Sequence, residues 1–251
     1  MIVSSACPLC SPRCRVAAVV LLALVCATGA RAQDVAIGDP IPAAAAVRAN
    51  TVPTIDGRLD EDCWQQAPGV AGFTRVGSDR PASQPTVVRL LFDERALYIG
   101  FLCHEPNPGE LAHTHSGEDA DVWFDDSVEI FIDPGHTHER YFQFALNCIG
   151  ATFDRHMEDI GWTAEWRVGT WIGEDRWTAE VAMPFSALEC AAPRTGDVFA
   201  ANFCRNRKTS NADAQSHGEW SSWAPVQSQY HEPQNFGHVI FADAPNEIPL
   251  R

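Results

Sequence analysis

The chain has almost no lysine and carries no familiar catalytic signature. Lys208 is the single lysine among 251 residues, and the formal net charge is −15. An acidic excess of this size disfavours binding to nucleic acid and to anionic membrane surfaces. The sequence contains no Gly-x-Ser-x-Gly motif, phosphate-binding loop or dinucleotide fingerprint. A glycosidase would need two carboxylates across a cleft, and no second one stands out. The residues therefore give no support for catalysis.

Long apolar runs are missing except near the start of the chain. Basic residues precede an apolar run at 16–25, and Ala30-Arg31-Ala32 then offers small residues on either side of an arginine. A transmembrane helix needs about 20 apolar residues, so this arrangement indicates a secretory signal peptide instead. We expect residues 1–32 to be cleaved before Gln33, giving a secreted or periplasmic protein without membrane insertion. Their removal takes the net charge from −15 to −18, because they hold three arginines and no acidic residue.

The mature chain also lacks any Cys-x-x-Cys pair, which disfavours a zinc ribbon. An odd number of cysteines remains after cleavage, so at least one thiol must stay unpaired within the chain. These cysteines are Cys63, Cys103, Cys148, Cys190 and Cys204.

Turn signals divide the rest of the chain into many short strands. We interpret 33–45 as a linker rich in Ala, Pro and Gly, 46–243 as one domain, and 244–251 as a tail. Helical signal is weak, with single turns expected near 61–66 and 184–188. Short strands between polar turns predict an all-β fold, an antiparallel β-sandwich of jelly-roll-like form. The expected strands are Thr86–Phe92, Ala96–Glu105, Ser127–Asp133, Tyr141–Phe153, Glu165–Gly173, Trp177–Met183, Val198–Arg205 and Gly237–Phe241.

Two of these strands combine an apolar face with a polar face. In Ser127–Asp133 the apolar residues alternate with Glu129, and Trp123 lies shortly before the strand. In the strand expected at Tyr141–Phe153, Gln143 and Asn147 project from the face opposite the core. An aromatic ring stacked on a sugar, with carboxylate and amide groups bonding the hydroxyls, is a way to hold carbohydrate. The alternative is an ordinary sandwich strand with a solvated outer face.

Five motifs in sequence order resemble carbohydrate-binding module family 9 and its family 9-like relatives. Any one of them is weak, but their order and spacing cover nearly the whole mature chain. They are Thr54–Trp64, Val88–Ile99, Asp126–Asp133, Trp177–Phe185 and Phe236–Val239.

The resemblance implies a β-sandwich that binds sugar without catalysis, of a type often attached to xylanases. In such modules two aromatics clamp the terminal sugar, and the matching positions here are Trp123 and Tyr230. Glu129 matches the carboxylate that bonds sugar hydroxyls, and Asn147 matches a ligand asparagine. The sequence departs from the family at Ala145, where sugar binders carry arginine.

A second departure is the tyrosine at position 230, where the family usually has tryptophan. Arg205 or Arg207 could replace the missing arginine from a neighbouring strand, because no small residue imitates its forked donors. Trp220 and Trp223 lie near the second clamp position, and either could belong to the site or to the core.

Other constellations suggest weaker alternatives. Two His-Thr-His triplets, at 113–115 and 136–138, could chelate a metal, but we interpret them as solvated loops. The acidic run at 118–126 could hold a structural calcium ion. A different class of function is electron transfer with haem b between Met157 and a histidine such as His156. A third is an envelope scaffold without a small ligand.

Overall fold

The structure, a computed structural model, describes residues 41–208 and 218–245. The predicted signal peptide and its cleavage site lie outside these ranges. The described residues belong to one unit that spans Asp39–Arg251. Among them, no helix has both the length and the apolar character needed to cross a membrane.

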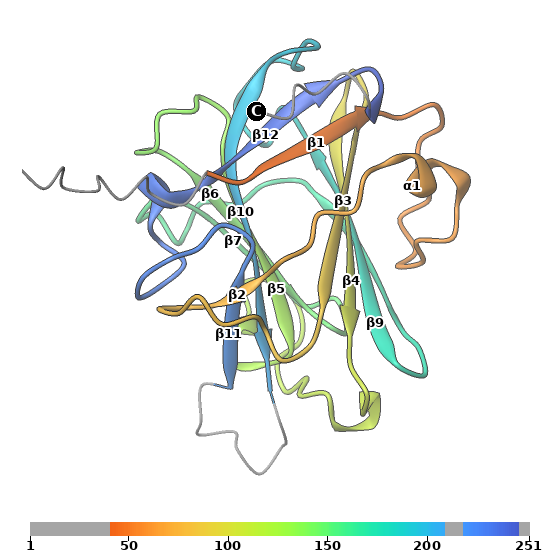
Figure 1. The fold of residues 1–251 in the computed structure, drawn as a ribbon, viewed down its shortest axis with the longest axis vertical. Helices are drawn as coiled ribbons and strands as arrows, with labels where there is room; N and C mark the ends of the chain where they lie inside the picture. The colour runs from red at the N-terminus through yellow and green to blue at the C-terminus, as the bar shows by residue number, and fades with distance from the viewer. Residues whose placement is uncertain (1–40, 209–217, 246–251) are drawn as a thin grey trace, which may run out of the picture. The chain divides into compact units, whose positions relative to one another are not determined.

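Strands are the main regular elements of the described chain, as expected for an all-β fold (Figure 1). The helical elements are short: α1 (Asp62–Gln66) and the 3-10 turns η1 (Pro108–Glu110), η2 (Val122–Phe124) and η4 (Pro233–Asn235). The strands are β1 (Ala43–Arg48), β2 (Thr74–Arg75), β3 (Thr86–Phe92), β4 (Ala96–His104), β5 (Ser127–Asp133), β6 (Phe142–Asn147), β7 (Thr152–His156), β8 (Arg167–Ile172), β9 (Arg176–Pro184), β10 (Val198–Arg207), β11 (Glu219–Ser222) and β12 (Gly237–Ala242).

The strands pair in the order β7-β6-β5-β10-β12-β1-β3-β4-β9-β8, with β11 joining β10 to β2. Every pairing is antiparallel except those of β1, which runs parallel to β12 and to β3. The two halves of this path pack face to face around the main apolar core. That core takes Val128, Ile130 and Phe144 from one half and Leu90 and Val181 from the other. The predicted β-sandwich is confirmed.

The first strand begins inside the predicted linker. Residues 43–45 belong to β1, and Ala44 and Ala45 are almost completely buried. Alanine has low intrinsic strand preference, so the run Ala43–Ala46 resembled a linker in the sequence. Its pairing on both sides, with β12 and β3, supplies the strand hydrogen bonds that local preference does not.

The strand predicted at Tyr141–Phe153 is a hairpin formed by β6 and β7. Gly150 has φ 84°, and the Asn147 side-chain oxygen accepts the Ala151 N–H at 2.9 Å, so the chain reverses between them. The apolar alternation of β6 continues as far as Cys148 and hides this turn in the sequence. The hairpin places β7 beside β6 on the face that forms the site described below.

Two smaller expectations can also be compared with the structure. The turn expected at 61–66 is α1, and the one expected at 184–188 corresponds to Pro184, which ends β9, followed by non-helical turns at 185–188. All five cysteines in the described part of the chain are free thiols, and four of them are buried. Burial raises the pKa of the Cys103 thiol to about 11, so this thiol is poorly reactive at neutral pH.

Candidate functional site

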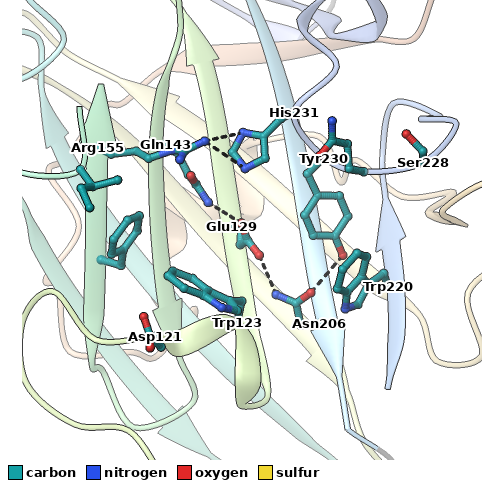
Figure 2. A pocket seen from close by; sticks show the side chains of 13 residues that line it. Asp121, Trp123, Glu129, Gln143, Arg155, Asn206, Trp220, Ser228, Tyr230 and His231 are labelled. Atoms are coloured by element: carbon teal, nitrogen blue, oxygen red, sulfur yellow. Dashed lines mark hydrogen bonds between the residues drawn. The ribbon is translucent and has the colours of Figure 1, made fainter. Parts of the chain in front are cut away.

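One outer face of the sandwich, formed by β5, β6, β7 and β10, carries polar side chains between two apolar clusters that partly cover it. Strand register brings Glu129, Gln143, Arg155 and Asn206 to this face from four different strands. They line a pocket of about 650 Å³ (Figure 2). This volume is within the range of about 300–1,000 Å³ usual for small-ligand sites.

Glu129 forms the centre of the pocket floor. Its two carboxylate oxygens accept hydrogen bonds from Gln143 Nε2 and Asn206 Nδ2, both at 2.7 Å. Burial raises the pKa of the Glu129 carboxyl group, and the two amide donors oppose that rise. Glu129 is thus held in one orientation, with the amides of Gln143 and Asn206 beside it in the pocket wall.

Two tryptophans stand on either side of this floor (Figure 2). Trp123 is part of η2 and packs edge-on against Phe153, with 5.0 Å between ring centroids and an interplanar angle of 89°. Trp220, on β11, lies on the opposite side of the pocket floor. Its ring packs against that of Tyr230, with 5.9 Å between ring centroids. Both indoles are only partly buried and line the pocket. The site therefore has two aromatic walls.

Tyr230 was predicted to form the second wall, and it shares that side of the pocket with Trp220. Its ring lines the pocket but is only 6 % exposed. Its hydroxyl donates to the Arg205 carbonyl at 2.8 Å and accepts the Ser221 N–H at 3.1 Å. Tyr230 packs against Trp220, and Trp220 presents the more accessible ring of the two.

Asn147 was predicted to bind the ligand, but it lies outside the pocket and is completely buried. Its Nδ2 donates to Asp125 Oδ2 and to the His115 carbonyl, both at 2.9 Å. Its side-chain oxygen accepts the N–H of Ala151 in the β6–β7 turn. These bonds use the amide to hold two loops together, so none of it is available to a sugar.

Arg205 was offered as a substitute for the family arginine, and it too lies outside the pocket. The side chain is 1 % exposed and points away from the site. It donates to the His104 carbonyl at 2.9 Å and approaches Thr86 Oγ1 at 3.3 Å. On β10 the neighbouring residue Asn206 faces the pocket instead, because successive side chains point to opposite faces of a strand.

Arg155 is the arginine that the structure places in the pocket. It belongs to β7, directly opposite Gln143 on β6. The family position, Ala145, is covered by a small apolar cluster that includes Phe153 and the partly buried Trp123. The sequence did not point to Arg155 because the β6–β7 turn was not recognised.

The acidic run that suggested calcium is partly engaged by the protein itself. Asp125 accepts the N–H groups of Thr114 and His115, and Asp126 accepts those of Ala112 and Lys208. Among the described residues, no group of three His, Cys, Asp or Glu side chains is placed to hold a metal ion. A structural calcium ion stays a prediction.

The loop at 136–138 is partly buried rather than fully solvated. His136 Nε2 lies 2.9 Å from Nδ1 of His238 on β12, and His138 Nδ1 lies 2.8 Å from the Pro233 carbonyl oxygen. Proximity to the other histidines and burial lower the pKa of His136, with burial the larger cause. The sequence could not show that His238 joins the pair.

The haem alternative finds no support in the described residues. His156 stacks on Phe142 with 4.3 Å between ring centroids. Met157, the next residue, packs against a different apolar cluster, and its sulfur accepts the Tyr141 N–H at 3.2 Å. Met183 is completely buried in the main core. These side chains do not face a common space between them.

Known proteins resemble this chain in both sequence and structure. Its sequence is 22 % identical over 192 residues to endo-1,4-beta-xylanase A of Thermotoga maritima, and to the same degree to that of Thermotoga neapolitana. The aligned part is 74 % of this chain but only 17 % of each xylanase.

Solved structures show the same fold. A family 9 carbohydrate-binding module from Caldicellulosiruptor kristjanssonii in complex with glucose superposes with a TM-score of 0.62 at 18 % identity, over 83 % of this chain and 100 % of the module. A complex of such a module from the same organism with cellotriose gives a TM-score of 0.61 at 18 % identity, over 84 % of this chain and 100 % of the module. These neighbours are binding modules rather than catalytic domains. Residues 55–244 match the family described as carbohydrate family 9 binding domain-like, and the chain belongs to that family.

Proposed function

We propose that this chain is an exported, non-catalytic module that binds the terminal sugar of plant-type polysaccharides such as xylan or cellulose and so assists their breakdown. The observation that carries the proposal is the pair of accessible indoles, Trp123 and Trp220, on either side of a floor of carboxylate and amide groups.

The chemistry of this pocket suits a sugar ring. A pyranose has apolar C–H faces and a polar rim, so two aromatic walls can cover the faces. Carboxylate and amide groups can accept and donate hydrogen bonds at the rim. Glu129, Gln143 and Asn206 are already bonded to one another, so their orientations are fixed before a ligand arrives.

The relatives support the same class of ligand. The two module structures contain glucose and cellotriose. The curated relatives are xylanases, of which this chain spans about a sixth, and that is the basis for placing it beside a xylan-degrading activity. Export rests on the signal peptide predicted at residues 1–32.

Calorimetry with xylo- and cello-oligosaccharides tests the proposal on the wild type, Trp123→Ala and Phe124→Ala. Phe124 follows Trp123 in η2 and is 50 % exposed, but it does not line the pocket, so it is a matched control. We expect measurable binding by the wild type and by the control, and weaker binding by Trp123→Ala. Equal binding by all three would move the site elsewhere. No binding by any of them would favour the scaffold alternative.

N-terminal sequencing and intact mass of the exported protein test the predicted localisation. A chain that begins at Gln33 supports export by a cleaved signal peptide. A chain that retains residues 1–32 would contradict it.

A further inference from the structure

The charged side chains that the structure describes in the pocket form no ion pair with one another, although the charge of Arg155 opposes the rise in the pKa of Glu129. Arg155 is the only permanent cation among the described residues that line it. Of the two lining carboxylates, Glu129 is occupied by the amides of Gln143 and Asn206, and Asp121 is exposed at the rim. No described carboxylate forms an ion pair with Arg155, although other arginines of the chain form such pairs.

The contacts of Arg155 are with neutral groups. Its Nη2 lies 2.9 Å from Nδ1 of His231. Burial, with a smaller contribution from Arg155 itself, lowers the pKa of His231 to about 4, so the imidazole is neutral at pH 7. The Nε of Arg155 is buried and has no hydrogen-bond partner among the described residues. The guanidinium group therefore keeps its charge for a ligand, which would reach its Nη groups rather than the buried Nε.

A guanidinium group in this state favours an anionic ligand over a neutral one. Its planar fork matches the two oxygens of a carboxylate, and charge-assisted hydrogen bonds are about twice as strong as neutral ones. A hydroxymethyl group offers one oxygen and no charge. The negative net charge of the chain opposes anions at long range, so any preference for them must come from contact with Arg155.

The layout of the pocket separates this charge from the aromatic walls. Arg155, Gln143 and His231 lie together at one end, and Trp123, Asn206 and Trp220 lie at the other (Figure 2). We propose that the pocket selects a cyclic sugar acid, a hexuronate whose ring lies between Trp123 and Trp220 and whose carboxylate pairs with Arg155. This inference rests on the proposed function and names the class of sugar at the same site.

Glucuronate and glucose make a matched pair of probes, because they differ only in having a carboxylate or a hydroxymethyl group at the same carbon. Calorimetry at pH 7 should show the wild type binding glucuronate at least about tenfold more tightly than glucose. Arg155→Gln should remove that preference and change glucose affinity by less than about threefold. Arg167→Gln is the control, because Arg167 is an exposed residue of β8 outside the pocket, and it should behave as the wild type.

Two additions keep the outcomes distinct. Arg155→Lys retains the charge but loses the fork, so its preference for glucuronate should be reduced without vanishing. This variant tests the role of Arg155 if Arg155→Gln does not fold. Acetate tests whether any carboxylate suffices, and acetate binding as tight as glucuronate would overturn the inference. Glucose binding as tight as glucuronate in the wild type would overturn it while leaving the proposed function intact. Failure of all the sugars to bind would overturn both.

Discussion

The two outer faces of the sandwich each carry a buried glutamate, but the groups around the two carboxylates differ. Glu180 on β9 accepts the N–H groups of Asp56 and Gly57 and the Nε1–H of Trp64, at 2.7–2.9 Å. Those donors come from a distant segment that lies over the strand and closes the face. The donors to Glu129 come from β6 and β10, in the same layer, so the space above Glu129 stays open as a pocket.

A carboxylate on the outer face of a strand therefore does not by itself mark a binding site. The opening motif of the family closes the β9 face in this chain. Gly57 has φ 91°, and a Cβ atom there would lie 2.3 Å from the Thr170 backbone, so only glycine fits. The motif around Gly57 stabilises the fold, whereas the polar face of β5 forms the pocket that we assign to the ligand.

The largest effect that separates the two faces is expected from Trp64→Ala. Trp64 is completely buried, packs with Tyr98 and Ala182, and bonds Glu180. Its loss should cost about 3–5 kcal/mol of unfolding free energy, while the folded fraction keeps its sugar affinity. Urea unfolding and calorimetry measure the two quantities. If Trp64→Ala weakened sugar binding as well, the faces would not be independent.

A smaller loss of stability is expected from Asn147→Ala. The substitution removes the side-chain acceptor of the Ala151 N–H and one of the donors to the Asp125 carboxylate, which should cost about 1–3 kcal/mol. Sugar affinity should not change, because Asn147 is outside the pocket. Gln143→Ala is the contrasting variant, since Gln143 lies in the pocket wall. Weaker binding by Asn147→Ala at unchanged stability would restore the ligand role predicted from the sequence.

The sequence predicted the strands better than it predicted the site. Alternation gave the exact bounds of β3 and β5, because both strands have continuous alternating or apolar patterns that end at polar turns. Trp123 and Glu129 were found because they lie within a few residues of each other on one strand and its approach. Arg155 and Asn206 reach the site through strand register, which pairs segments far apart in the chain.

Asn147 and Tyr230 show a different limit of the sequence. Both have side chains that suit a sugar, and both are used instead to fix loops or strands. Which hydrogen bonds a polar side chain makes depends on neighbours that the local sequence does not identify. Trp220 was ambiguous between site and core for the same reason, and in the structure it lines the pocket and also packs against the apolar cluster around Tyr230.

The roles of the two rings at the second wall can be separated by Trp220→Ala and Tyr230→Phe. Removing the accessible indole should weaken sugar binding by about 1–3 kcal/mol, as for other buried aromatic anchors. Tyr230→Phe keeps the ring but leaves the Ser221 N–H and the Arg205 carbonyl unpaired, so it should lower stability with little effect on affinity. Calorimetry and urea unfolding on both variants would show the reverse pattern if Tyr230 were the wall.

A further expected effect is a dependence of stability on pH that comes from the pocket face. The pKa of His231 is lowered to about 4 in the folded protein, mainly by burial, from an ordinary value of 6.5. Below pH 6.5, His231 therefore binds a proton in the unfolded chain but stays neutral in the folded protein until the pH approaches 4. The contribution of His231 to stability is present above pH 6.5, declines as the pH falls to about 4, and is constant below that.

Other buried groups act in the opposite direction, so the wild-type profile alone does not isolate His231. Burial raises the pKa of Glu180 to about 7 and that of Asp126 to about 6, and the stability linked to these groups is lost as the pH rises. Urea unfolding of the wild type and His231→Gln at pH 7, 5.5 and 4 separates the contributions. As the pH falls, the free energy of unfolding of His231→Gln should rise relative to that of the wild type. His113→Gln changes an exposed histidine, and its free energy of unfolding should follow that of the wild type. A difference that stays constant from pH 7 to 4 would mean that His231 takes up its proton in the folded protein, and Arg155 would then face a cation rather than a neutral ring.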